Sequence, residues 1–103
     1  MNKCIFIGNL SKDPELRTTP NGVSVATFSI AVNRRFKDAN GEKKTDFINI
    51  VCWRQLAEMC GKYLTKGKKV AVVGELQTRS YDAKDGTKRY ITEIVADEVE
   101  FLT

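Results

Sequence analysis

Two aromatic rings in the stretch from Thr45 to Trp53 are the side chains of this sequence best placed to hold a ligand. β-Branched and aromatic residues dominate the stretch, and neither Gly nor Pro interrupts it, which predicts a β-strand. Side chains alternate between the faces of a strand, so Phe47 and Trp53 share one face with Asn49 between them. The opposite face carries an aliphatic row typical of a core: Ile48, Ile50 and Cys52. The ring-bearing face therefore either packs on another element or forms a surface on which flat molecules stack.

A third ring, Phe36, lies between cations next to a predicted turn. Its neighbours in the chain are Arg34, Arg35 and Lys37. A ring flanked by cations is costly to bury deeply, because the charges would lose their hydration. Phe36 therefore either folds back on its own strand as a loop anchor or presents an aromatic face beside charges that bind anions. The local pattern leaves both interpretations open.

Further rings lie in segment 79–90, which predicts a long hairpin that turns at Asp85-Gly86. Its cations are interleaved with the rings: Arg79, Lys84, Lys88 and Arg89. Tyr81 lies near the exposed end of this hairpin, where a ring has little reason to be unless it meets a ligand. Tyr90 enters the following strand and is predicted to be structural.

The composition argues against catalysis and against a cofactor or metal site. The chain has 103 residues and no histidine, which removes the usual general base and most zinc sites. Cys4, Cys52 and Cys60 show no metal-type spacing, so buried free thiols are expected. Paired acids such as Asp82 and Asp85 are explained by turn chemistry. We therefore predict a protein that is not an enzyme and needs no cofactor.

The charge and hydropathy of the chain indicate which partners and which cellular location to expect. Lys and Arg number 17 against 13 acids, for a net charge of +4, and this mild excess favours polyanionic partners. No apolar run is long enough to span a bilayer or to form the core of a signal peptide. A cytoplasmic location is therefore expected.

Five strands are predicted to carry these side chains, at residues 3–8, 23–34, 45–53, 70–76 and 91–103. The second of them has one regular core face: Ala26, Phe28, Ile30 and Val32. Turn residues at 13–14 and 20–22 predict a loop ahead of that strand. The pair Gly8-Asn9 is interpreted as a turn or barrel corner in preference to a functional close approach, and Gly74 indicates a bend.

One helix is predicted between the third and fourth strands. Apolar residues recur at spacings of three and four from Arg54 to Thr65, which is typical of an amphipathic helix, and Gly67 closes it. The fold class is therefore all-β, and this order of elements predicts an OB-fold: a five-stranded Greek-key barrel with long β-hairpin loops. We expect residues 1–103 to form one such domain. The second and third strands and the long loops are the usual binding face of this fold, and the unexplained rings fall there.

Five short segments, in their order and spacing, make a specific combination: IGNLSKDPELR at 7–17, PNG at 20–22, QLAE at 55–58, KYLTKG at 62–67 and GELQTR at 74–79. With these segments the chain resembles bacterial single-stranded DNA-binding proteins over essentially its whole length. The resemblance implies a homotetramer in the cytoplasm, associated with the nucleoid. It also implies binding to single-stranded DNA without sequence preference, in DNA replication, recombination and repair.

The resemblance also implies roles for individual side chains. Four aromatic positions match those that stack on bases: Phe36, Phe47, Trp53 and Tyr81. Phosphate contacts are expected from cations that flank these rings or lie on matched loops: Arg17, Arg34, Arg54, Lys66, Arg79, Lys84 and Arg89. Members of the family normally continue into a Gly/Pro/Gln-rich linker and an acidic tip that recruits replication and repair proteins. This sequence ends at Thr103, so the acidic C-terminal tail is expected to be absent.

Two other kinds of binding protein compete with this interpretation. An OB-fold primosomal accessory or RNA-binding protein would share the rings, and its RNA-binding form would prefer RNA through contacts with the 2′-hydroxyl group. A structural assembly protein would instead cover the aromatic face with a protein partner. The interleaved cations speak against that alternative, because the centres of protein interfaces are depleted in charge.

Overall fold

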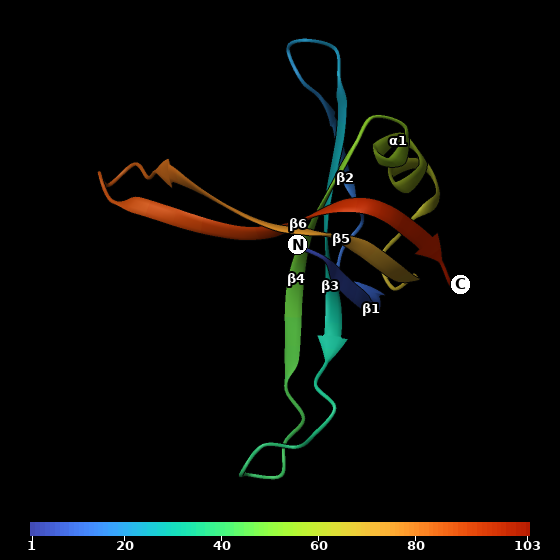
Figure 1. Cartoon of the computed structure of the whole chain (residues 1–103), viewed down its shortest axis with the longest axis vertical. Coiled ribbons are helices and arrows are strands. Elements are labelled where there is room, and N and C mark those ends of the chain that lie inside the picture. Colours follow the sequence, from blue (N-terminus) through green and yellow to red (C-terminus); the bar gives the residue numbers. More distant parts are fainter.

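The computed structural model describes all 103 residues, as six strands and one helix (Figure 1). In chain order the elements are β1 (Cys4–Leu10), β2 (Glu15–Thr18), β3 (Ser24–Asn33), β4 (Thr45–Trp53), α1 (Arg54–Tyr63), β5 (Lys69–Asp82) and β6 (Lys88–Phe101). The strand predicted at 45–53 has the predicted bounds. The helix begins where predicted and ends at Tyr63. No helix of the structure is long and apolar enough to cross a membrane.

Five of the strands close into a ring. The sheet order is β1-β5-β6-β4-β3-β2, and an additional pairing joins β1 to β3. Residues 4–9 of β1 pair with β5, while Asn9 and Leu10 pair with β3. The β4–β6 pairing is parallel, and the other pairings are antiparallel. This closed arrangement, with the helix between β4 and β5, confirms the predicted OB-fold.

The sixth strand, β2, lies in the segment that was predicted to be a loop. Its four residues are all exposed, and it pairs only with the first half of β3, outside the ring. Leu16 is its one apolar residue, so no alternating pattern marks it. Backbone hydrogen bonds to β3 therefore define this strand, and its side chains give no sign of it.

The first strand continues through Gly8, where it was predicted to end. Gly8 lies inside β1 next to the residues that cross from β5 to β3. A Cβ added there would lie 2.5 Å from the carbonyl oxygen of Ala31, so the barrel can close at this point only with glycine. The predicted barrel corner is present, and it is made by close backbone approach within a continuous strand.

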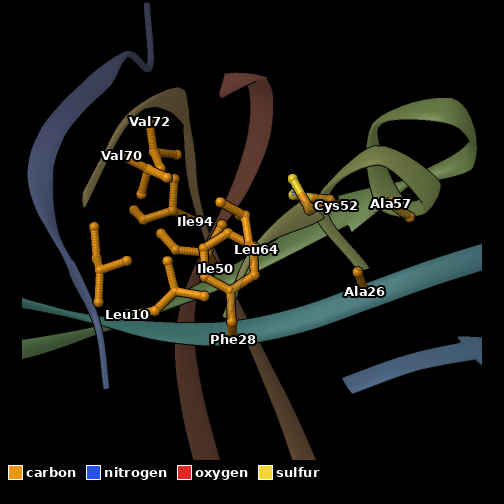
Figure 2. Close-up of a cluster of buried hydrophobic side chains, with 12 residues drawn as sticks. Leu10, Ala26, Phe28, Ile50, Cys52, Ala57, Leu64, Val70, Val72 and Ile94 are labelled. Carbon is orange, nitrogen blue, oxygen red and sulfur yellow. Dashed lines mark hydrogen bonds between the residues drawn. The ribbon is translucent and has the colours of Figure 1, made fainter. Parts of the chain in front are cut away.

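The core fills the ring with apolar side chains from five strands and from the helix segment (Figure 2). The predicted core faces of β3 and β4 are confirmed: Ala26, Phe28, Ile30, Ile50 and Cys52 are buried. Buried residues of α1 lie against the end of β4, and Cys52 Sγ is 3.9 Å from Cys60 Sγ. The hydrogen bond to Cys60 and burial raise the pKa of Cys52, so its thiol stays neutral at physiological pH. Both thiols are buried, as expected.

Besides the turn between β2 and β3, two longer arms extend from the barrel (Figure 1). One is the loop of residues 34–44 between β3 and β4. The other is the β5–β6 hairpin, whose pairing continues out to Asp82 and Lys88, well beyond the predicted strand end at Leu76. The irregularity predicted at Gly74 is a shift in the β5–β6 register between Val73 and Gly74. The predicted site residues therefore lie partly on the barrel and partly on these arms.

Candidate functional site

The ring-bearing face of β4 is open to solvent. The Phe47 and Trp53 residues are 63% and 43% exposed, and Asn49 between them is exposed as well. The two rings are six positions apart in the chain, a distance of about 20 Å along a strand. Because both are exposed, neither ring packs into the core, although Val51 on the same face is buried.

An open groove of about 360 Å³ lies between the two rings on this face. One side is formed by β2, β3, β4 and the loop before β2, and the other by the β5–β6 hairpin. Its lining residues are Lys12, Asp13, Glu15, Arg17, Thr27, Phe28, Ser29, Asn49, Ile50, Val51, Arg79, Ile91 and Glu93. Thr27, Ser29 and Asn49 come from the outward faces of β3 and β4, so the groove crosses the middle of the ring-bearing surface.

Tyr81 continues the face of the hairpin that lines the groove. Arg79 pairs with Ile91 and Tyr81 with Arg89 across β5 and β6. Because cross-strand partners share a face and alternate residues return to it, Tyr81 lies on the same side as the groove-lining Arg79. Tyr81 is 47% exposed. Its ring therefore extends the surface of Phe47 and Trp53 onto the hairpin arm.

Tyr90 is not structural, contrary to the prediction. It is 77% exposed and pairs with Ser80, which places it on the opposite face of the hairpin from Tyr81. The prediction assumed that a ring entering a strand would be buried. The hairpin here extends beyond the barrel, so neither of its faces is covered at this point by another element.

Phe36 does not fold back on its strand. It lies in the β3–β4 loop and is 77% exposed, with the guanidinium carbon of Arg35 5.3 Å from its ring centroid. The loop is held at its turn by Asp38, whose Oδ1 accepts hydrogen bonds from the backbone N–H groups of Asn40 and Glu42. The loop-anchor interpretation is therefore wrong. Phe36 presents its ring to solvent beside a cation.

Most of the arginines predicted to bind phosphate are paired with acids. Arg34 donates two hydrogen bonds to Asp46, from Nε at 2.9 Å and from Nη2 at 3.0 Å. These bonds raise the pKa of Arg34 and lower the pKa of Asp46. Three further pairs are Arg17–Glu15 at 3.5 Å, Arg79–Glu93 at 3.0 Å and Arg89–Asp85 at 3.5 Å. No ion pair holds the remaining three: Arg54, Lys66 and Lys84.

Arg54 lies at a strained junction between β4 and α1. Its φ is 59°, and it is the one residue other than glycine with a positive φ. A left-handed conformation costs a residue with a Cβ roughly 1–2 kcal/mol. This backbone conformation leads the chain from Trp53 directly into α1. The strained residue is therefore a cation that follows a candidate stacking ring.

The structure brings some of the predicted residues together and leaves others apart. Arg17 and Arg79 line the groove, whereas none of the four rings does, and Phe36 and Lys84 lie on the projecting loops. The sequence-based predictions did not assign six other polar groove residues to the site: Lys12, Asp13, Glu15, Thr27, Ser29 and Glu93. The small, half-polar outward face of β3 was the signal for Thr27 and Ser29. No group of three potential metal ligands occurs in the structure.

Residues 1–102 match the model of the single-strand binding protein family, SSB. The chain belongs to this family. SSB family proteins bind single-stranded DNA and are not catalysts. The match covers every element of the barrel and both arms, so the groove and the exposed rings are features of an SSB domain.

Bacterial relatives with high identity extend beyond this chain. It is 54% identical over 102 residues to single-stranded DNA-binding protein 2 of Staphylococcus aureus (strain COL), covering 99% of this chain and 73% of the relative. Single-stranded DNA-binding protein 3 of Clostridium acetobutylicum is 58% identical over 103 residues, with 99% and 71% covered. The single-stranded DNA-binding protein of Bacillus cereus is 54% identical over 102 residues, with 99% and 60% covered. The chain thus spans 60–73% of the length of these relatives.

Proposed function

We propose that this SSB domain binds single-stranded DNA without sequence preference, by stacking bases on exposed rings and neutralising phosphates with flanking cations. Membership of the family establishes single-stranded DNA binding itself. The observation that supports the stacking mechanism is the open, ring-bearing surface that runs along β4 and onto the hairpin arm. Its proposed base-stacking residues are Phe36, Phe47, Trp53 and Tyr81.

Stacking explains both the tolerance of sequence and the choice of strand. Every unpaired base has an apolar π-face, so a ring such as Trp53 can accept any of them. In single-strand binding proteins of this class, removing a stacking ring costs roughly 1–3 kcal/mol per base, a range that comes from the class as a whole. In a duplex these faces are hidden between neighbouring base pairs. Duplex DNA therefore offers the rings nothing to stack on.

Phosphate neutralisation is proposed for the cations that flank the rings or lie on loops matched to the family: Arg17, Arg34, Arg54, Lys66, Arg79, Lys84 and Arg89. Arg54 directly follows Trp53, and Lys84 lies three residues beyond Tyr81, and neither has an acidic partner. Cations of this kind contribute without first breaking a pair. The paired arginines, such as Arg34, must exchange a carboxylate for a phosphate, so each of them adds less to the affinity.

We also propose that copies of the chain associate, as the predicted homotetramer requires. Residues 4–8 of β1 have a strand partner on one side only, and Ile5 and Ile7 are exposed there. An apolar strand with a free edge is suited to pairing with a second copy. In sedimentation equilibrium, wild-type protein is expected to have the mass of a tetramer, and an Ile5→Glu/Ile7→Glu variant a smaller mass.

Within the cell, we propose that residues 1–103 act as the DNA-binding domain in replication, recombination and repair. The location expected for that role is the cytoplasm, on the nucleoid. Recruitment of replication and repair proteins is proposed to require sequence of the kind that the longer relatives have in addition to this domain.

Fluorescence of the sole tryptophan, Trp53, tests the proposed function. Oligo-dT is expected to quench its emission strongly and saturably, because a stacked base lies against the ring. Competition with RNA and duplex DNA of equal length is expected to show that single-stranded DNA binds best. Binding of oligo-dT with unchanged emission would remove Trp53 from the site, and a preference for RNA would favour the RNA-binding alternative.

A further inference from the structure

The charged residues that line the central groove have a net charge of zero, although the chain as a whole is basic. These residues are three cations and three acids: Lys12, Arg17, Arg79, Asp13, Glu15 and Glu93. Two of the cations are already paired, Arg17 with Glu15 and Arg79 with Glu93. A phosphate that entered this groove would meet as many negative as positive charges. Arg17 and Arg79 are therefore weaker phosphate contacts than the cations without an acidic partner, and an uncharged part of the nucleotide suits the groove better.

The position of the groove requires a nucleotide to cross it. Phe47 and Trp53 flank the groove on β4, about 20 Å apart, and both are proposed to stack on bases. A strand that reaches from one ring to the other must carry its intervening nucleotides over the groove. The groove floor offers three polar side chains that make no hydrogen bond within the protein: Thr27, Ser29 and Asn49. Such groups suit the edge of a base.

One ion pair in the groove has unused hydrogen-bonding groups of both kinds. Arg79 Nε donates to Glu93 Oε1 at 3.0 Å, and this is the only side-chain bond that either residue makes. The second carboxylate oxygen of Glu93 and the terminal nitrogens of Arg79 remain free. The Glu93 side chain is only 14% exposed, so a hydrogen bond made there is little weakened by water.

The bases differ in what they could offer to this pair. The Watson–Crick edge of guanine carries two adjacent donors, N1–H and N2–H₂, beside the O6 acceptor. A carboxylate accepts two parallel N–H groups, and a guanidinium donates to a carbonyl oxygen. Adenine and cytosine each present a single amino donor on that edge, and thymine a single N3–H. Guanine therefore complements a carboxylate that lies next to a guanidinium better than the other three bases do.

We propose that Arg79 and Glu93 form a guanine-reading subsite within the sequence-tolerant surface. Glu93 accepts hydrogen bonds from N1–H and N2–H₂, and Arg79 donates to O6. Single-stranded nucleic acid exposes this edge, which base pairing hides in a duplex. The subsite rests on the proposed function, because it requires DNA bound across β4. Stacking on the rings alone gives no sequence preference. The subsite adds a modest preference for guanine.

Repeating oligonucleotides of equal length test the subsite in the wild-type protein. Repeats of d(GTT) and d(ITT) differ only in the N2 amino group, which inosine lacks, and isolated guanines avoid four-stranded structures. Titrations followed by Trp53 emission are expected to show at least about fivefold tighter binding of the guanine repeat, the low end for one specific base contact. Equal affinity for the two repeats, with both bound, would overturn the subsite and leave the proposed function intact. Failure to bind either repeat, or oligo-dT, would count against the proposed function and the subsite together.

A matched variant assigns the preference to Glu93. Glu93→Gln replaces one acceptor oxygen by an NH₂ group that faces the guanine donors, with almost no change in volume. The variant is expected to lose the difference between d(GTT) and d(ITT). Because it also removes the negative charge paired with Arg79, any gain in affinity from that change is expected to be shared equally by d(GTT), d(ITT) and d(TTT). If it keeps the guanine preference, the subsite is wrong. Thermal unfolding of the variant verifies its fold, and the wild-type comparison stands independently of it.

Discussion

Phe47 and Ile50 lie three residues apart on β4, and their environments are opposite. Ile50 is completely buried in the barrel, whereas most of Phe47 is open to solvent. The folded chain gains little from the Phe47 ring, since hydrophobic stabilisation scales with the apolar area removed from water. We therefore attribute the ring to the proposed stacking on a base, and the two positions separate the contributions of this strand to binding and to folding.

The Phe47→Ala variant is expected to weaken binding to oligo-dT by about 1–3 kcal/mol, the range typical of this protein class. Its melting temperature is expected to change little. Ile50→Ala on the same strand is the matched control and is expected to lose about 2–5 kcal/mol of unfolding free energy, because it leaves a cavity in the core. Fluorescence titration and urea denaturation measure the two effects. A large loss of stability in the Phe47 variant would indicate a packing role for that ring.

Arg54 combines backbone strain with a charge next to Trp53, and two substitutions separate these features. Both Arg54→Ala and Arg54→Gly remove the charge, and only glycine accepts a φ of 59° without strain. The glycine variant is therefore expected to be about 1 kcal/mol more stable than the alanine variant. Both are expected to bind oligo-dT more weakly than the wild type, by similar factors. A higher free energy of unfolding for Arg54→Ala than for Arg54→Gly would contradict backbone strain at this position.

At the scale of elements, the sequence correctly predicts strands that have one buried face and one exposed face. In β3, Ala26, Phe28 and Ile30 are buried while the residues between them are not, so a period of two is visible; in β4 the same alternation holds up to Ile50. Residues 15–18 of β2 are all exposed, and the pairing with β3 that creates this strand leaves no hydrophobic pattern. The outer halves of β5 and β6 have no hydrophobic pattern either, and the long hairpin predicted for residues 79–90 was identified from its Asp85-Gly86 turn signal. Tyr90 was misjudged because the hairpin leaves the barrel before reaching it.

The two faces of the hairpin arm can be tested with its two exposed tyrosines. Tyr81 shares the groove-lining face, and Tyr90 lies on the other. Tyr81→Ala is expected to weaken DNA binding by about 1–3 kcal/mol, whereas Tyr90→Ala is expected to leave it nearly unchanged. Neither substitution should lower the melting temperature appreciably, because both rings are outside the core. If the Tyr90 variant lost more affinity than the Tyr81 variant, the binding face of the arm would be the reverse of the one proposed.

For the whole molecule, the net charge of +4 conceals how the charges are arranged. The sequence predicts where cations accompany rings, and the exposure of those rings agrees with it. It does not predict that Arg34 is held by Asp46, because the two residues are 12 positions apart and meet only when β3 and β4 pair. Cross-strand contacts of this kind depend on register, which local patterns do not fix. The number of cations free to meet phosphate is therefore smaller than the composition suggests.

This arrangement has a measurable effect on the salt dependence of binding. The logarithm of affinity is expected to fall with the logarithm of salt concentration by roughly 0.7 for each phosphate neutralised. Asp46→Asn removes the charge that forms the ion pair with Arg34. The variant is therefore expected to bind DNA more tightly at low salt and to steepen this slope by about 0.7. The matched control is Asp97→Asn, which makes the same charge change beside Lys3, outside the proposed phosphate contacts.

The control is expected to keep the wild-type slope in Trp53 titrations over a range of salt concentrations. Acidification should not reproduce the Asp46→Asn effect near neutral pH. The pair lowers the pKa of Asp46, so this carboxylate stays charged, and Arg34 stays paired, until the pH falls below the usual range for aspartate. Equal slopes for the Asp46 variant and the wild type would mean that bound DNA already displaces Asp46. Arg34 would then contact phosphate as fully as the cations that have no acidic partner.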